Sequence, residues 1–232
     1  MGEMVDVDRD TRTAPVYSTG RLTVRRRIGK RLFDLVVASV CLLLLSPLML
    51  TIALLIRAST PGRAFFRQER LGRYGRPFVL YKFRTMYSDC ADDIHRAYVR
   101  KLLVEDRPPA GGQRGLYKLE NDPRVTRVGR FLRRTSLDEL PQLLNVIRGD
   151  MSLVGPRPAL SWEAELFNPA DYRRFLAMPG LTGLWQVSGR NSLTMRQGLM
   201  LDLEYVEKQN FALDLAILLK TVPAVFTTHG AL

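Results

Sequence analysis

The chain has 232 residues, of which 46% are hydrophobic, and its formal net charge is +12. This apolar content suffices for a folded core and excludes global disorder. The charge predicts an anionic partner: nucleic acid, an acidic lipid or a phosphorylated substrate. Two cysteines form no disulfide framework and indicate a reducing compartment, and two histidines disfavour an imidazole-rich zinc site. A bound metal would more readily be a hard cation on carboxylates.

The N-terminal part contains a tail and a long apolar run. Residues 1–20 are polar and lack apolar periodicity, so we expect a mobile tail. Residues 21–60 are predicted to form a membrane segment with basic flanks. Its apolar run, 32–56, could cross the roughly 30 Å hydrocarbon core as a straight helix. Ser46-Pro47 interrupts the run at its middle.

Basic residues flank the apolar run on both sides, before it from Arg25 to Arg31 and after it from Arg57 to Arg70. The positive-inside rule places such charges on the cytoplasmic side, so a single crossing would put one cluster on the wrong side. A re-entrant hairpin broken at Pro47 returns both ends to one face, and the Ser46 hydroxyl could satisfy part of the freed backbone. The residues alone are equally compatible with this re-entrant hairpin and with a spanning helix kinked at the proline.

The remaining residues, 61–232, are predicted to form one domain beside the membrane. It begins with short strands around a glycine-rich turn, between 63 and 86. The period of two in FVLYKFR places Lys82 and Arg84 on one face of the second strand, so they would project together, as phosphate-binding residues do. A solvated strand edge protected by charge is the alternative.

Further elements follow from local patterns. Residues 211–226 are strongly apolar but contain Asp214, Lys220 and Pro223. We expect an amphipathic helix lying at the membrane interface, with a buried core helix as the alternative. The other predicted elements are helices at 87–104, 162–177 and 193–209, and loops at 105–115 and 179–191.

The stretch TSLDELPQLLNVIRGDMSLVGPRP, residues 135–158, concentrates the candidate chemistry. Proline is tolerated in the first turn of a helix, so Pro141 predicts a helix start and places Asp138 at or next to the N-cap, where a carboxylate or a phosphate is stabilised. Ser136 and Glu139 have the spacing of a capping box, which would make both acids structural. Against this, a Ser136 cap would put Pro141 past the first turn. Asp138 and Glu139 point about 100° apart on a helix, so they would need different tasks.

The end of this stretch presents a basic side chain. Prolines on both sides of Arg157 fix the backbone direction, which suits a guanidinium that clamps a phosphate. The residue types alone therefore predict a membrane-associated protein with a carboxylate and an anion site. The candidate phosphate-binding side chains are Lys82, Arg84, Arg133, Arg157 and Arg190.

With its motifs taken in order, the chain resembles the monotopic polyprenyl-phosphate phosphoglycosyl transferases, a family of bacterial sugar transferases. The resemblance runs from about Lys30 to Phe226. The motifs that carry it are KRLFDLVVASVCLLLLSPL (30–48), YKFRTM (81–86), NDPRVTRVGRFLRRTSLDELPQLLNVIRGDMSLVGPRP (121–158), PGLTGLWQVSGRN (179–191) and LDLEYV (201–206).

The resemblance implies an α+β, mostly helical fold with a small β-hairpin, interfacial amphipathic helices and a re-entrant membrane helix broken at Ser46-Pro47. It implies that Asp138 and Glu139 are a catalytic pair that holds Mg²⁺. Asp138 would attack a nucleoside-diphosphate sugar, usually a UDP-sugar, release UMP and carry the phosphosugar, which polyprenyl (undecaprenyl) phosphate then accepts in a ping-pong sequence.

The resemblance also assigns further residues and a location. Lys82, Arg133, Arg157 and Asp202 match residues of the family motifs. The chain resembles a catalytic-core form on the cytoplasmic face of the bacterial inner membrane, making a lipid-linked sugar for exopolysaccharide or another cell-surface glycan. The expected partners are the UDP-sugar, the lipid acceptor and the phospholipid bilayer, without nucleic acid.

Two other functions are compatible with the residues alone. One is a non-enzymatic, membrane-anchored basic protein that binds anionic lipid or nucleic acid. The other is a hydrolase that uses the same carboxylates on nucleotide sugars and needs no lipid acceptor. No sugar-reading pocket is identifiable in the sequence; the loop at 105–115 and the C-terminal third are the candidates for that role.

Overall fold

The computed structural model describes residues 24–87, 122–189 and 193–226. The tail 1–20, the loop 105–115, Arg190 and all but the first residue of the predicted helix at 87–104 therefore lie outside the described residues. The helices and short 3-10 turns are α1 Val24–Ser59, η1 Arg73–Gly75, α3 Arg127–Thr135, η2 Leu137–Glu139, α4 Gln142–Arg148, α5 Ser161–Ala164, η3 Pro169–Leu176, α6 Leu184–Ser188, α7 Met195–Lys208 and α8 Phe211–Phe226. The strands are β1 Phe65–Leu71, β2 Pro77–Phe83, β3 Ser152–Val154 and β4 Gly180–Thr182.

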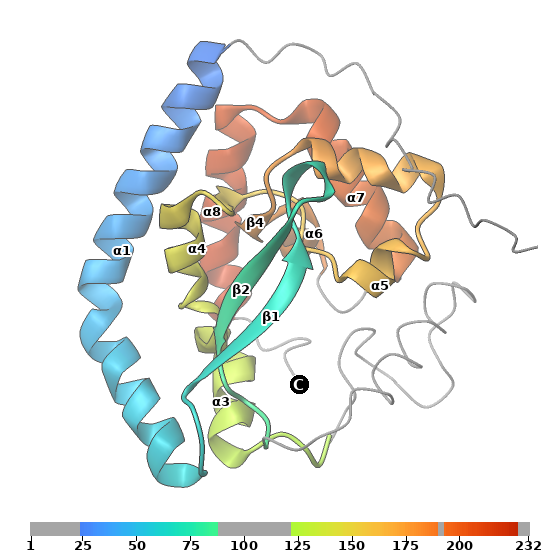
Figure 1. Cartoon of the computed structure of the whole chain (residues 1–232). Coiled ribbons are helices and arrows are strands. Elements are labelled where there is room, and N and C mark those ends of the chain that lie inside the picture. Colours follow the sequence, from blue (N-terminus) through green and yellow to red (C-terminus); the bar gives the residue numbers. More distant parts are fainter. Residues whose placement is uncertain (1–23, 88–121, 190–192, 227–232) are drawn as a thin grey trace, which may run out of the picture.

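The fold is α+β and mostly helical, as predicted. Strands β1 and β2 pair antiparallel as a hairpin, and β3 and β4 pair parallel. The hairpin turns at Tyr74 and Gly75, which both have positive φ. In Figure 1 the long helix α1 bows along one edge of the molecule, with α4 beside it and the hairpin crossing the front of the body.

Helix α1 continues through Ser46-Pro47 as one helix. Pro47 has no N–H to donate to the Leu43 carbonyl four residues earlier, and the Ser46 hydroxyl donates to that same carbonyl at 2.8 Å. The prediction that Ser46 satisfies freed backbone is confirmed. The predicted break of the helix at Ser46-Pro47 is corrected, because this hydrogen bond lets one continuous helix pass the proline. The re-entrant path through a bilayer stays a prediction.

Both halves of α1 pack on the same protein body. In the N-terminal half, Ala38 is buried in a core with residues of α4, β3, α7 and α8. In the C-terminal half, Ile52 and Ile56 pack with Phe83 of β2 and Leu132 of α3. A third core lies between α5, η3, α6 and α7. The ends of α1 are therefore both fixed to one domain.

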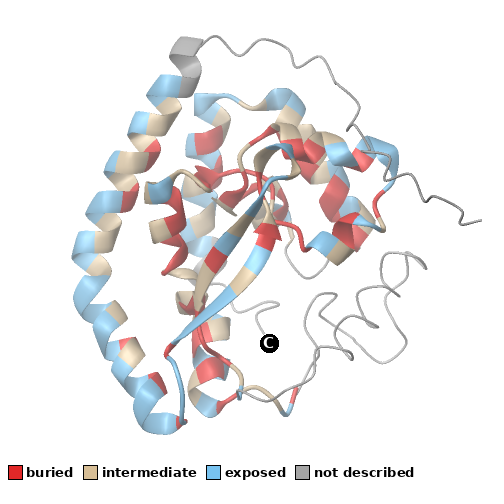
Figure 2. Ribbon diagram, in the orientation of Figure 1, coloured by how far each residue is buried: buried red, intermediate tan, exposed pale blue. Residues whose placement is uncertain are grey.

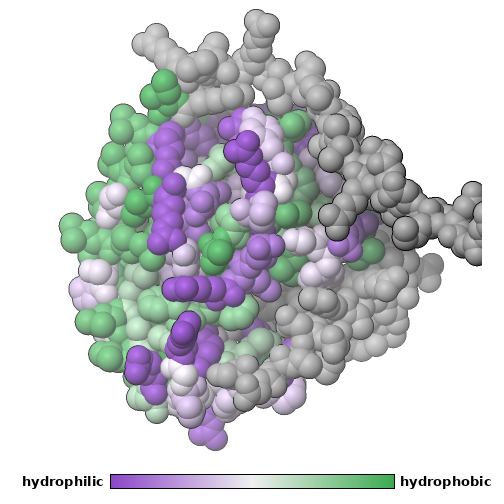
Figure 3. Space-filling view, viewed as in Figure 1, coloured by the Kyte–Doolittle hydropathy of each residue, from purple (hydrophilic) through white to green (hydrophobic). Residues whose placement is uncertain are grey.

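The outer face of α1 is apolar and exposed, as the pale blue ribbon of Figure 2 and the green edge of Figure 3 show. The exposed residues are Ile28, Leu32, Val36, Val40, Leu43, Leu44, Leu48, Leu50, Leu54 and Leu55. Among the described residues, α1 is the one helix long and apolar enough to cross a membrane. Its 36 residues would measure about 54 Å if straight, well over the roughly 30 Å of a hydrocarbon core.

Helix α8 combines features of both predictions for the C-terminal segment. Asp214 and Ile217 face the body and are buried, whereas Phe211, Leu215 and Leu219 are exposed. One face is thus core and the opposite face is an apolar stripe, which suits a helix at a membrane interface.

Candidate active site

The acidic pair lies in a tight turn between α3 and α4. Helix α3 ends at Thr135, and Ser136 adopts a left-handed conformation (φ 56°) that starts the 3-10 turn η2. Asp138 is buried, with 9% of its surface exposed, and Glu139 is partly exposed. The predicted helix start is confirmed, because Pro141 occupies the N-cap position of α4.

Two details of this turn differ from the prediction. Asp138 lies three residues before the N-cap position, because Ser136 starts a separate 3-10 turn ahead of the helix. The capping box that would have made the acids structural does not form, because the Ser136 side chain makes no capping hydrogen bond. Instead the Glu139 N–H donates to the Ser136 carbonyl at 3.2 Å. The Glu139 side chain has a partner on a neighbouring strand.

That partner is Lys82, near the end of β2. Its ammonium lies 2.7 Å from Glu139 Oε1, and about a fifth of the Lys82 side chain and a third of the Glu139 side chain are exposed. The sequence separation of this pair is 57 residues. An ion pair that remains open to solvent can exchange its lysine between the carboxylate and an arriving phosphate, since a partly exposed pair is only weakly held.

Arg133, in the last turn of α3, lies beside the acids. Burial lowers the pKa of Arg133, and attraction to the carboxylates of Asp138 and Asp122 opposes that change. The Arg133 guanidinium also donates from Nε to Thr85 Oγ1 at 2.9 Å. Arg133 therefore supplies positive charge next to Asp138 from a fixed position. We call Lys82, Arg133, Asp138 and Glu139 the acid cluster.

Arg84 does not project with Lys82. Strand β2 ends at Phe83, and the buried Arg84 guanidinium donates to the carbonyls of Thr60 (2.9 Å) and Pro61 (2.5 Å) just past the end of α1. A guanidinium there stabilises the helix C-terminus through its dipole and its free carbonyls. The period-of-two prediction is corrected here, because the strand stops before reaching Arg84.

Arg157 and Asp202 belong to a second group, built around Arg174. The Arg174 guanidinium donates to the Arg157 carbonyl at 2.7 Å and forms an ion pair with Asp202. Asp202 has no exposed surface. Burial raises the pKa of Asp202 to about 6, and Arg174 opposes part of that rise. Asp202 is placed to act through Arg174, which fixes the backbone that presents Arg157.

Sequence reasoning missed Asn145, whose side chain is fully buried. Its Oδ1 accepts from the Tyr81 N–H at 3.1 Å and its Nδ2 donates to the Val79 carbonyl at 2.7 Å. The amide thus makes the two bonds to β2 that a neighbouring strand would make. It ties the strand carrying Lys82 to the helix that follows the acids. The signal in the sequence was a single amide between the apolar residues Leu143-Leu144 and Val146-Ile147.

The acids fit a magnesium ion in part. Mg²⁺ is usually held by one or two carboxylates together with substrate phosphates and water, and Asp138 and Glu139 supply two carboxylates of that kind. Within the described ranges, no group of three or more acidic, histidine or cysteine side chains converges. The donor set therefore suits a metal that arrives with, or is completed by, a phosphorylated substrate.

Comparison with known proteins gives the family. Residues 25–228 match the family described as bacterial sugar transferase. The exopolysaccharide production protein ExoY of Rhizobium meliloti is 44% identical over 92% of each chain. The undecaprenyl-phosphate galactose phosphotransferase of Salmonella typhimurium is 43% identical over 88% of this chain and 42% of its own length. The UDP-glucose:undecaprenyl-phosphate glucose-1-phosphate transferase of Caulobacter vibrioides is 44% identical over 88% of this chain and 72% of its own length.

The match covers α1, the acid cluster and the Arg157 group in one alignment. The 44% identity with ExoY covers 92% of each chain, so the sequence similarity includes both the helices and the hairpin of this fold. The chain belongs to the bacterial sugar transferase family of enzymes.

Proposed function

We propose that this enzyme transfers a sugar 1-phosphate from a UDP-sugar to undecaprenyl phosphate, as the first membrane step of exopolysaccharide or related glycan assembly. The names of similar proteins support the donor and the acceptor. The observation that carries the chemistry is the solvent-open ion pair of Glu139 and Lys82, one residue after the buried Asp138. The charge of Asp138 also interacts with that of Arg133.

In the first step an Asp138 carboxylate oxygen attacks the β-phosphorus of the donor. The bond from that phosphorus to the oxygen bridging the two phosphates breaks, and UMP leaves with that oxygen and its electron pair. The sugar phosphate is then joined to Asp138 as an acyl phosphate. Splitting a transfer through a covalent intermediate lets one site serve a soluble and a lipid substrate in turn.

In the second step a phosphate oxygen of undecaprenyl phosphate attacks the same phosphorus. The bond to Asp138 breaks, the carboxylate is restored, and the product is a diphosphate-linked lipid sugar. As proposed, an anionic oxygen is the nucleophile in both steps, so neither step includes proton removal by a general base.

The surrounding residues supply charge and position. Arg133 holds positive charge beside Asp138, and Lys82 can pass from Glu139 to a donor phosphate; such electrostatic stabilisation is most of what phosphoryl transfer requires. Asp138 and Glu139 are the residues that would hold Mg²⁺, which when bound neutralises diphosphate charge. Arg157 and the undescribed Arg190 are the remaining candidates for phosphate contacts. Asp202 supports Arg157 through Arg174.

The packing of α1 supports a monotopic arrangement on the cytoplasmic face. Near its start, Lys30 bonds Asp214 of α8 at 2.8 Å. Just past its end, Thr60 bonds Arg84. If α1 crossed the bilayer as a straight helix, its two ends would lie on opposite sides. One of these two polar contacts with the domain would then be lost. A path that enters and leaves through one face keeps both.

This arrangement can be tested by cysteine labelling in right-side-out and inverted inner-membrane vesicles. With Cys41 and Cys90 replaced by serine, single cysteines at Ile28 and Ser59, one at each end of α1, should both react with a membrane-impermeant maleimide only in inverted vesicles. Labelling of the two ends from opposite sides would establish a spanning helix instead.

The reaction can be tested with purified full-length enzyme, undecaprenyl phosphate, Mg²⁺ and a UDP-sugar whose sugar is labelled. UDP-glucose and UDP-galactose are the first donors to try. Wild type should release UMP and produce a labelled lipid, and without acceptor the label should stay on the protein. Asp138→Asn should lower the rate by about 10³-fold or more, as expected for removal of a nucleophile.

Glu204→Gln is the matched control, because Glu204 is a carboxylate on the solvent face of α7 paired with Lys208. Equal activity of wild type and Asp138→Asn with the cognate donor would refute the nucleophile. Release of free sugar phosphate without acceptor would identify a hydrolase. Salt-sensitive lipid or nucleic-acid binding without turnover would support the non-enzymatic alternative.

A further inference from the structure

A large cavity lies at the N-terminal end of α1, apart from the acid cluster. Its volume is about 1070 Å³, and its walls come from α1, η1, the segment around β3, the residues after η3, and the α7–α8 junction. Its lining includes none of the four acid-cluster residues. The cavity is larger than many ligand pockets, which span about 300–1,000 Å³.

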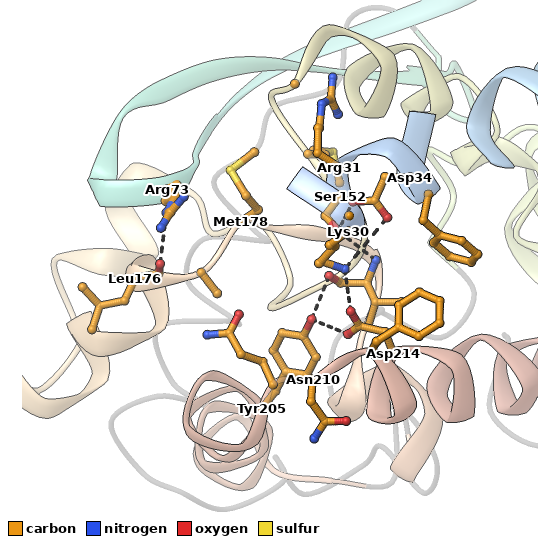
Figure 4. Close-up of a pocket in the computed structure, with 18 of the residues that line it drawn as sticks. Lys30, Arg31, Asp34, Arg73, Ser152, Leu176, Met178, Tyr205, Asn210 and Asp214 are labelled. Atoms are coloured by element: carbon orange, nitrogen blue, oxygen red, sulfur yellow. Dashed lines mark hydrogen bonds and ion pairs between the residues drawn. The ribbon is translucent and has the colours of Figure 1, made fainter. Parts of the chain in front are cut away.

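One wall is a hydrogen-bonded polar network, which runs through the middle of Figure 4 from Asp34 and Ser152 to Asp214 and Tyr205. The Lys30 ammonium lies 2.8 Å from Asp214 and 3.9 Å from Asp34. Ser152 Oγ donates to Asp34 at 2.7 Å, and the Tyr205 hydroxyl bonds Asp214 at 2.6 Å. Both carboxylates are thus already covered by donors, so this wall does not favour a cationic ligand.

Two guanidiniums complete the charged lining. Arg73 Nε donates to the Leu176 carbonyl at 3.1 Å, and Figure 4 shows Arg73 and Met178 across the cavity from Tyr205 and Asn210. Arg31 donates to the carbonyls of Val146 and Ile147 at 2.6 and 2.8 Å. Three cations against two carboxylates leave the lining with one net positive charge. The complementary ligand is a monoanion.

The cavity also has an apolar side that continues into the membrane-facing surface. Phe33 and Phe211 line it in edge-to-face contact, with ring centroids 5.2 Å apart. Phe211 begins the exposed apolar stripe of α8, and Leu32 and Val36 of α1 are exposed beside Phe33. A ligand here would have its charge inside and its apolar part along these two helices.

We propose that this cavity binds the headgroup of one resident bilayer phospholipid, a phosphodiester with a single negative charge, whose acyl chains lie along α1 and α8. A free phosphate ion would leave most of the volume and the apolar side unused. A zwitterionic lipid would add an ammonium to a lining that is already positive. The undecaprenyl acceptor must bring its phosphate to Asp138, which is not part of this lining.

The test uses the full chain in nanodiscs of equal phosphatidylglycerol and phosphatidylcholine, followed by native mass spectrometry of the retained lipid. Wild type should keep one phosphatidylglycerol per chain. Arg73→Gln removes a cation from the wall, and Ala212→Trp fills the space from α8. Each should lower the retained fraction about tenfold or more, the scale of one charge-assisted hydrogen bond.

Two control variants match these changes outside the cavity. Arg76→Gln removes an exposed cation from the same hairpin turn, and Ala216→Trp adds the same indole one turn along α8; neither residue lines the cavity. Both should retain lipid as wild type does. Equal retention by Ala212→Trp and Ala216→Trp would overturn the proposal, as would equal retention of both lipids. Displacement of the retained lipid by stoichiometric undecaprenyl phosphate would reassign the cavity to the acceptor.

Discussion

Two carboxylate–cation pairs in this enzyme have similar chemistry and opposite exposure. In the Lys82–Glu139 pair, 21% and 31% of the side-chain surfaces are exposed; in the Arg174–Asp202 pair, 4% and 1%. An open pair is worth little to stability and can change partners, whereas breaking a sealed pair leaves an uncompensated buried charge. Exposure, more than residue type, therefore separates the pair suited to substrate from the pair that supports the fold.

The largest effect expected from this comparison is on folding. Asp202→Ala removes every acceptor that Asp202 offers to Arg174 and should lower the free energy of unfolding by about 3–5 kcal/mol. Asp202→Asn keeps an oxygen acceptor and should cost less than half as much. Urea unfolding in detergent micelles measures both. If Asp202→Ala were as stable as wild type but inactive, Asp202 would belong with the substrate-binding residues.

The sealed pair should also make stability depend on pH. The pKa of Asp202 is raised to about 6 in the fold, so this carboxyl binds a proton more tightly in the folded than in the unfolded chain. Its contribution is full below about pH 4 and is lost as pH rises through 6, by on the order of 2–3 kcal/mol. The free energy of unfolding of wild type minus that of Asp202→Asn, measured from pH 4 to 7, should show this decline. A flat difference would contradict the shift.

Smaller effects are expected for Lys82 and Arg84, which are two residues apart. One should change the KM for the donor and the other the free energy of unfolding. Lys82→Gln should raise the KM for the donor about tenfold. The free energy of unfolding should be nearly unchanged, because the partner of Lys82 is a carboxylate exposed to solvent. Arg84→Gln should lower unfolding free energy by about 1.5–3 kcal/mol, because charged hydrogen bonds to the end of α1 are lost, with KM unaffected. Donor titrations and unfolding curves on both variants separate the roles. A raised KM in stable Arg84→Gln would restore Arg84 to the phosphate site.

Local patterns predicted the elements that local physics controls. Alternation and a glycine-rich turn predicted the β1–β2 hairpin, and Pro141 predicted the start of α4. The Ser46 hydroxyl satisfies the carbonyl that Pro47 leaves free. Each of these depends on residues within about one turn or one strand of each other, where backbone geometry is set by neighbours.

The tertiary structure decided which distant residues become polar partners. The partner of Glu139 is 57 residues away and that of Asn145 is 66 residues away. The place of Arg84 under α1 depends on where β2 stops, which periodicity does not state.

By itself, the sequence determined that adjacent carboxylates precede a proline at the start of a helix and accompany many basic residues and an apolar run. Only the tertiary structure decided that the charges of Asp138 and Arg133 interact, that Glu139 pairs with Lys82 in contact with solvent, and that Asp202 is buried against Arg174. The physical reason is desolvation. An ion pair that stays exposed to solvent can exchange partners, whereas a buried one is structural. Packing between distant segments decides how exposed each pair is.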